Sequence, residues 1–166
     1  MGAAQAATPD GRPGFGVAVV REDGTWRCQV LRRGVLANLG EAETELRELR
    51  STGAVFGLLN VDDEFFVVVR PAPAGARLLL SDATAALEYD LAAEVLDTLD
   101  ADLDEEDLDD TDPFAEGDLE VLADLGLSAA VLGVIVADPE LYADEQVSRI
   151  AAEMGFEAPL AAALRR

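Results

Sequence analysis

The chain has no histidine, no lysine and a single cysteine among its 166 residues. Without histidine it cannot form a Ser-His or Cys-His catalytic pair, nor a zinc site that uses imidazole. Without lysine it has no Schiff-base amine and no P-loop lysine. The lone Cys28 cannot form a disulfide within the chain, and its alternation with Trp26 and Val30 favours a small buried side chain over a reactive thiol. Few groups remain for proton chemistry, so we expect a protein that is not an enzyme and that binds no cofactor and no metal.

Basic residues are also missing from one long part of the chain. Residues 78–148 hold 22 Asp and Glu and no Arg or Lys, whereas the remainder balances 12 acids against 12 arginines. The net charge of -22 is therefore a local property, densest in residues 97–120, where 13 of 24 residues are acidic. Such a field favours a basic partner and repels nucleic acid, so direct nucleic-acid binding is not expected.

Membrane and export signals are absent from the sequence as well. Residues 1–13 lack the basic and apolar regions of a signal peptide and are expected to form a flexible tail. The longest uncharged apolar stretch, 125–137, is shorter than the roughly 20 residues that span a bilayer. We therefore expect a cytoplasmic protein that does not enter membranes.

The first half of the chain predicts an α+β domain over residues 14–99. Asp23-Gly24 is a hairpin turn signal, and the apolar spacing of Leu39, Ala42 and Leu46 predicts a helix with one buried face. Two runs, 54–61 and 64–70, are apolar on both faces, which is typical of central strands covered on both sides. The predicted order is β-β-α-β-β-β, an antiparallel sheet of about five strands with one or more helices, with strands at 15–21, 25–31, 54–61, 64–70 and 77–80 and the helix near 41–50.

The second half predicts helices on either side of an acidic linker. Ser81 is a candidate cap for a helix that continues to Leu99. Residues 100–118 form the linker, which we expect to be mobile because its charges repel one another. Residues 119–166 predict a small C-terminal helical part: 144–154 is a helix with Asp144 as candidate cap, whereas 128–137 fits either a helix or a strand.

Carboxylates are numerous, but no pattern among them specifies a metal site or a catalytic pair. Asp100, Asp102 and Asp104 have the odd spacing of a calcium loop, yet Glu105 stands where that loop needs glycine. The acids at 62–64 are explained by turn formation.

A docking segment is the functional interpretation that remains for the acidic run, against the alternative of a solvated linker. Apolar residues recur among the acids, as in segments that bind a basic and partly apolar groove. The candidate partner-binding residues are Asp102, Leu103, Asp104, Glu105, Glu106, Asp107, Leu108, Asp109, Asp110 and Phe114.

Three stretches in a fixed order resemble a known family. They are AVFGLLNVDDEFFVVVRPAPAGARLLLSDATAA (54–86), DLDEEDLDDTDP (102–113) and GDLEVLADLGL (117–127), and the all-arginine, Ala- and Asp-rich composition is typical of actinobacteria. The chain is similar to the tRNA adenosine deaminase-associated proteins of actinobacteria over about residues 14–160. The resemblance implies an accessory protein whose basic partner is the deaminase. The chain is not itself the deaminase, which needs H-x-E and P-C-x-x-C motifs.

A second hypothesis keeps the acidic run as a solvated linker. In it, the sheet and its helix form a sensor domain that binds a small ligand in a pocket lined by Arg70 or Arg77.

Overall fold

The computed structural model describes residues 14–49, 51, 53–73, 75–101, 103–109 and 111–165, so the tail predicted at 1–13 lies outside the described residues. The strands are β2 (Phe15–Glu22), β3 (Thr25–Val30), β4 (Ala54–Val61), β5 (Phe65–Ala72), β6 (Gly75–Leu80) and β7 (Glu116–Gly117). The helices are α1 (Leu39–Arg47), α2 (Asp90–Thr98), α3 (Glu105–Leu108), α4 (Ala129–Ala137), α5 (Ala143–Met154) and α6 (Glu157–Leu164), with 3-10 turns η1 (Arg33–Leu36), η2 (Ala83–Leu87) and η3 (Ala123–Leu125).

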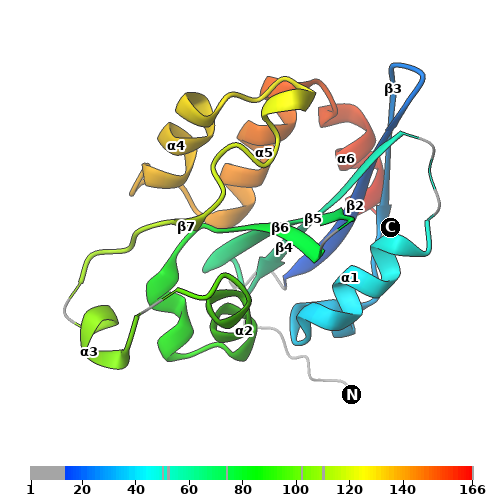
Figure 1. Cartoon of the computed structure of the whole chain (residues 1–166). Coiled ribbons are helices and arrows are strands. Elements are labelled where there is room, and N and C mark those ends of the chain that lie inside the picture. Colours follow the sequence, from blue (N-terminus) through cyan, green and yellow to red (C-terminus); the bar gives the residue numbers. More distant parts are fainter. Residues whose placement is uncertain are drawn as a thin grey trace.

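The strands form one antiparallel sheet in the order β3-β2-β4-β5-β6-β7. Helices α4, α5 and α6 cover one face, and α1 and α2 cover the other (Figure 1). The predicted α+β fold is confirmed. The sheet has one strand more than expected, because β7 comes from the acidic part of the chain and pairs with β6.

Each face of the sheet has its own apolar core, because successive side chains of a strand point to opposite faces. Phe56 and Leu58 of β4 pack with the C-terminal helices, whereas Leu59 packs with α1 and α2. The two-sided apolarity of β4 and β5 thus follows from burial on both sides, as their sequences predict. Residues of α4, α5 and α6 share one continuous core with the sheet.

Local chemistry explains where the helices begin, and it corrects two predictions. Asp82, not Ser81, caps the turn η2: its carboxylate accepts from the Thr84 N–H at 2.9 Å. Ser81 is 5% exposed and its Oγ accepts from the Phe66 N–H at 2.9 Å. It therefore bonds to strand β5 of the sheet and does not cap a helix. Two elements, η2 and α2, stand where one continuous helix was expected.

The ambiguous stretch 128–137 is helical, since Ser128 caps α4 through its Oγ and the Val131 N–H. Helix α5 begins after Tyr142, so the prediction of Asp144 as its cap is wrong. Across the residues that the structure describes, none of the helices combines the length and apolar character of a membrane span.

Candidate partner-binding face

The acidic segment, defined as residues 97–120, runs from the end of α2 past α3 and β7. Figure 1 shows α3 on the side of the molecule opposite β3. Leu108 is 5% exposed, and Leu103 and Phe114 pack against the core shared by α1, α2 and the sheet. These residues, which the sequence suggests as apolar anchors for a partner, lie in the chain's own core in this structure.

The carboxylates of the same segment point outward. Asp104, Glu106, Asp107 and Asp109 are all exposed. Asp104 and Asp107 each accept the other's backbone N–H at 3.0 Å, a reciprocal arrangement that closes the single turn α3. The predicted positions Asp102 and Asp110 lie outside the described residues, and Glu105 begins α3. The segment therefore presents negative charge on a backbone held by the buried Leu108 and by the partly buried Leu103 and Phe114.

Backbone contacts tie the end of the segment to the sheet. The Phe114 carbonyl accepts from the Ala83 N–H at 2.7 Å, and Glu116 pairs with Leu80 in the β6–β7 ladder. Gly117 has φ 124°, and a Cβ there would lie 2.4 Å from the Leu78 carbonyl oxygen. Only glycine meets both requirements, so this position fixes the register of β7.

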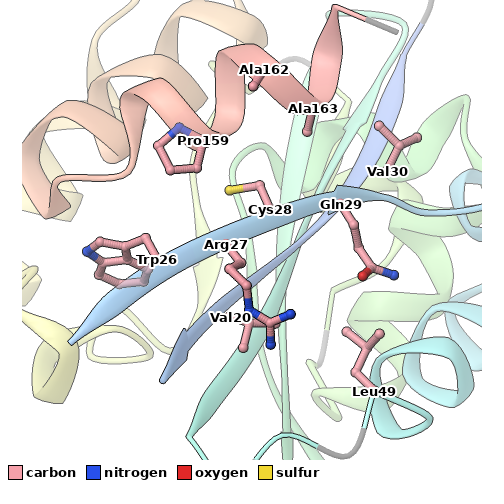
Figure 2. Close-up of a pocket in the computed structure, with 10 residues that line it drawn as sticks. All are labelled: Val20, Trp26, Arg27, Cys28, Gln29, Val30, Leu49, Pro159, Ala162 and Ala163. Carbon is pink, nitrogen blue, oxygen red and sulfur yellow. The ribbon is translucent and has the colours of Figure 1, made fainter. Parts of the chain in front are cut away.

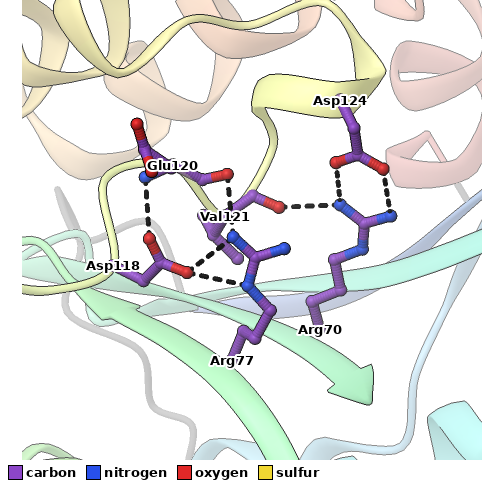
Figure 3. A network of polar contacts seen from close by, with 6 residues as sticks. All are labelled: Arg70, Arg77, Asp118, Glu120, Val121 and Asp124. Atoms are coloured by element: carbon purple, nitrogen blue, oxygen red, sulfur yellow. Dashed lines mark hydrogen bonds and ion pairs between the residues drawn. The ribbon is translucent and has the colours of Figure 1, made fainter. Parts of the chain in front are cut away.

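Two arginines on neighbouring strands hold the chain that follows β7. Arg70 and Arg77 are directly opposite each other in the β5–β6 ladder, where like charges repel unless they are neutralised. Arg77 donates to the Asp118 carboxylate at 2.7 Å and to the Glu120 carbonyl at 3.0 Å. Arg70 donates to the Asp124 carboxylate at 2.9 Å and to the Val121 carbonyl at 2.8 Å (Figure 3).

The titration of Asp124 reflects this contact. Its hydrogen bonds from Arg70 are the largest cause that lowers the pKa of Asp124 below its ordinary value. A lowered pKa keeps the carboxylate charged as the pH falls, so the tie persists into mildly acidic solution. Both guanidinium groups are engaged by the chain's own acids, so a ligand of the sensor hypothesis would have to compete with these contacts.

A groove of about 720 Å³ lies along β3, the outermost strand at one end of the sheet, beside α6. Figure 2 shows Trp26 and Cys28 pointing toward α6, and Arg27 and Gln29 pointing to the opposite side of the strand. Burial raises the pKa of Cys28 to about 11, so its thiol is protonated at neutral pH. A protonated thiol is a poor nucleophile, which favours a packing role for Cys28.

Metal binding finds no support in the arrangement of the acids. Within the described ranges, no group of three or more His, Cys, Asp or Glu side chains could hold a metal ion.

One functional contact was missed by sequence reasoning. Asp63, in the turn between β4 and β5, accepts the Asp144 N–H on its carboxylate at 2.7 Å and the Ala143 N–H on its carbonyl at 3.4 Å. Asp63 thus accepts hydrogen bonds from the first backbone N–H groups of α5, although Asp63 and Asp144 are 81 positions apart in the sequence. No local pattern reveals such a cap, although the positive φ of 61° at Asp63 marks an unusual turn.

Comparisons with known proteins agree with the resemblance. The family model of Rv3753c-like tRNA adenosine deaminase-associated proteins matches residues 14–157. A curated relative, Protein Rv3753c of Mycobacterium tuberculosis (strain ATCC 25618 / H37Rv), is 68% identical over 161 residues, which cover 97% of this chain and 91% of the relative. No solved structure matches the chain. The chain therefore belongs to the Rv3753c-like family of tRNA adenosine deaminase-associated proteins.

Proposed function

We propose that this protein is a non-catalytic accessory protein that binds tRNA adenosine deaminase through the exposed carboxylates of its acidic segment. The observation that carries the proposal is that the apolar side chains of this segment pack inward while its carboxylates are exposed to solvent. Leu108 is buried in the chain's own core and Leu103 and Phe114 pack against that core, whereas Asp104, Glu106, Asp107 and Asp109 are exposed. No Arg or Lys within residues 78–148 weakens the field that they produce.

The family name supplies the partner, and electrostatics supplies the reason for contact. An enzyme that acts on tRNA must contact phosphates, which requires clustered cations on its surface. A patch of fixed carboxylates is complementary to such a surface, speeds encounter with it and makes the complex sensitive to salt. On this proposal the accessory protein occupies the cationic surface of the deaminase until tRNA displaces it.

The test compares two variants with the same change in charge. One is Asp104→Asn, Glu106→Gln, Asp107→Asn and Asp109→Asn. It keeps Leu108, and the amide oxygens at positions 104 and 107 can still accept the backbone N–H groups that the carboxylates accept. The matched control neutralises four exposed acids elsewhere, namely Asp23→Asn, Glu48→Gln, Glu153→Gln and Glu157→Gln.

Binding to the purified deaminase is measured by calorimetry at low and at high salt. We expect the first variant to weaken binding about tenfold or more at low salt and the control to change it little, because only the first removes the complementary patch. Added tRNA should displace the wild-type protein. Equal weakening by both variants would mean that net charge alone attracts the deaminase, and unchanged binding by the first variant would overturn the proposal.

A further inference from the structure

A second hollow, of about 510 Å³, lies where the acidic segment meets the end of α4. Four carboxylates line it: Glu64 follows the β4–β5 turn, Asp82 follows β6, Asp112 belongs to the acidic segment and Asp138 follows α4. The lining contains no arginine, and the sequence has no lysine, so no basic side chain is among the residues that line the pocket. Its size is that of a site for a small molecule or for one long side chain.

The amide of Gln146 adds an oxygen acceptor to the wall of the pocket. Gln146 is 7% exposed and lines the pocket. Its Nε2 donates to the carbonyls of Ile135 at 3.0 Å and Val136 at 3.4 Å, which fixes the orientation of the amide. The carbonyl oxygen Oε1 accepts no hydrogen bond from the residues that the structure describes. Because Oε1 is not among the buried atoms without a partner, it is open to the pocket, where a ligand that brings N–H groups can donate to it.

The shape of this acceptor set selects the chemistry of the ligand. The described acids nowhere converge closely enough to hold a metal ion, so the pocket suits an extended cation with several donors. A guanidinium group has five N–H donors in a fixed plane and binds carboxylates in pairs. Pro113, Pro139 and Leu141 supply apolar walls, against which the aliphatic stem of an arginine can pack.

We propose that this pocket receives an arginine side chain of the basic partner protein. The pocket opens beside surface that a protein can cover: Asp112 and Pro113 belong to the acidic segment, and the adjoining helix α4 exposes Val134 at 65% and Val131 at 37%. A second copy of the chain meeting this face would place carboxylate against carboxylate, which is unfavourable. The inference rests on the proposed function for the identity of that partner, but not for the chemistry of the pocket.

The first measurement uses a small probe and the full chain labelled with ¹⁵N. Nα-acetyl-arginine methylamide is titrated and followed by NMR, with the neutral citrulline analogue and the lysine analogue as controls. We expect a saturable shift of the Gln146 side-chain NH₂ signals with arginine and none with citrulline. Equal responses to arginine and lysine would overturn the assignment of a guanidinium site.

Two matched double variants then separate the pocket from the general field. Glu64→Gln with Asp112→Asn removes two pocket carboxylates that are exposed, so we expect the fold to be kept. Asp23→Asn with Glu153→Gln removes the same charge from exposed positions that line neither the pocket nor the acidic segment. We expect the pocket pair to weaken arginine binding about fivefold, with partial solvent screening taken into account, and the control pair to leave it nearly unchanged.

The same variants are tested against the deaminase, so that failure of this inference differs from failure of the proposed function. The pocket pair should weaken the complex more than the control pair does. Equal weakening would leave the proposed function standing and overturn the arginine pocket. A saturable arginine site in a chain that does not bind the deaminase would support the pocket and reject the deaminase as the partner.

Discussion

At the scale of single residues, Asp63 does more than form a turn. Its carboxylate and carbonyl satisfy the first N–H groups of α5, and its carboxylate also accepts a weaker bond from the Asn60 amide at 3.4 Å. The negative charge also lies at the positive end of the helix. The turn between two central strands therefore helps to fix a helix that comes 81 positions later in the chain.

Replacing Asp63 by alanine should lower the free energy of unfolding by about 1–2 kcal/mol, which is the usual range for loss of a helix cap. Part of that loss comes from placing alanine at a positive φ, so the control is Asp23→Ala. Asp23 has φ 52° against 61° for Asp63, and it is exposed in a hairpin turn. Urea denaturation of both variants measures the difference, and equal losses would show that the contact with α5 contributes nothing.

At the scale of elements, the apolar periodicity of the sequence predicts the helices and strands whose burial is regular. It misses the elements that depend on contacts with distant residues. Helix α1 and strands β4 and β5 follow from their apolar spacing, because their burial is regular along the sequence. Strand β7 has two residues and no periodic signal: it exists because Gly117 fits against β6. Stretch 128–137 is apolar all round, so its pattern could not separate helix from strand, and Ser128 decides in favour of the helix.

Some features of the candidate site can likewise be predicted from the sequence, whereas others are seen only in the structure. Its charge was visible in the sequence, since that depends only on composition. The inward direction of Leu108 was not, because the leucines among the acids fit a partner's groove and the chain's own core equally well. The pocket beside Gln146 was also invisible, since its walls come from four separate parts of the chain.

Leu108→Ala therefore distinguishes a docked segment from a free linker. With Leu108 5% exposed, we expect the substitution to lower the free energy of unfolding by about 2–5 kcal/mol, as for other buried leucines. The neighbouring exposed residue provides the control, and Asp109→Ala should change stability by less than about 0.5 kcal/mol. Thermal or urea unfolding measures both, and a negligible effect of Leu108→Ala would indicate that the segment does not pack on the domain.

At the scale of the whole molecule, charge is distributed unevenly along the chain. Residues 78–148 carry the whole net charge, whereas the remainder of the chain is neutral. Repulsion among the carboxylates of residues 78–148 opposes folding, whereas Arg70 and Arg77 offset it at Asp124 and Asp118. On the proposed function, a cationic surface would relieve this repulsion, so the repulsion in the free protein would favour the complex.

Salt should consequently act in opposite directions on the free protein and on the complex. Raising NaCl from about 20 mM to about 500 mM shortens the Debye length from beyond 20 Å to below 5 Å, so repulsion within the acidic segment is screened. We expect the free energy of unfolding of the free protein to rise, and to rise less in the variant with Asp104, Glu106, Asp107 and Asp109 neutralised. Over the same range the affinity for a basic partner should fall, because attraction across the interface is screened as well. Denaturation curves and binding isotherms collected in the same buffers test both signs. If wild type and variant gain the same stability, the acidic segment is not the source of the repulsion, and the proposed link between this repulsion and binding is wrong.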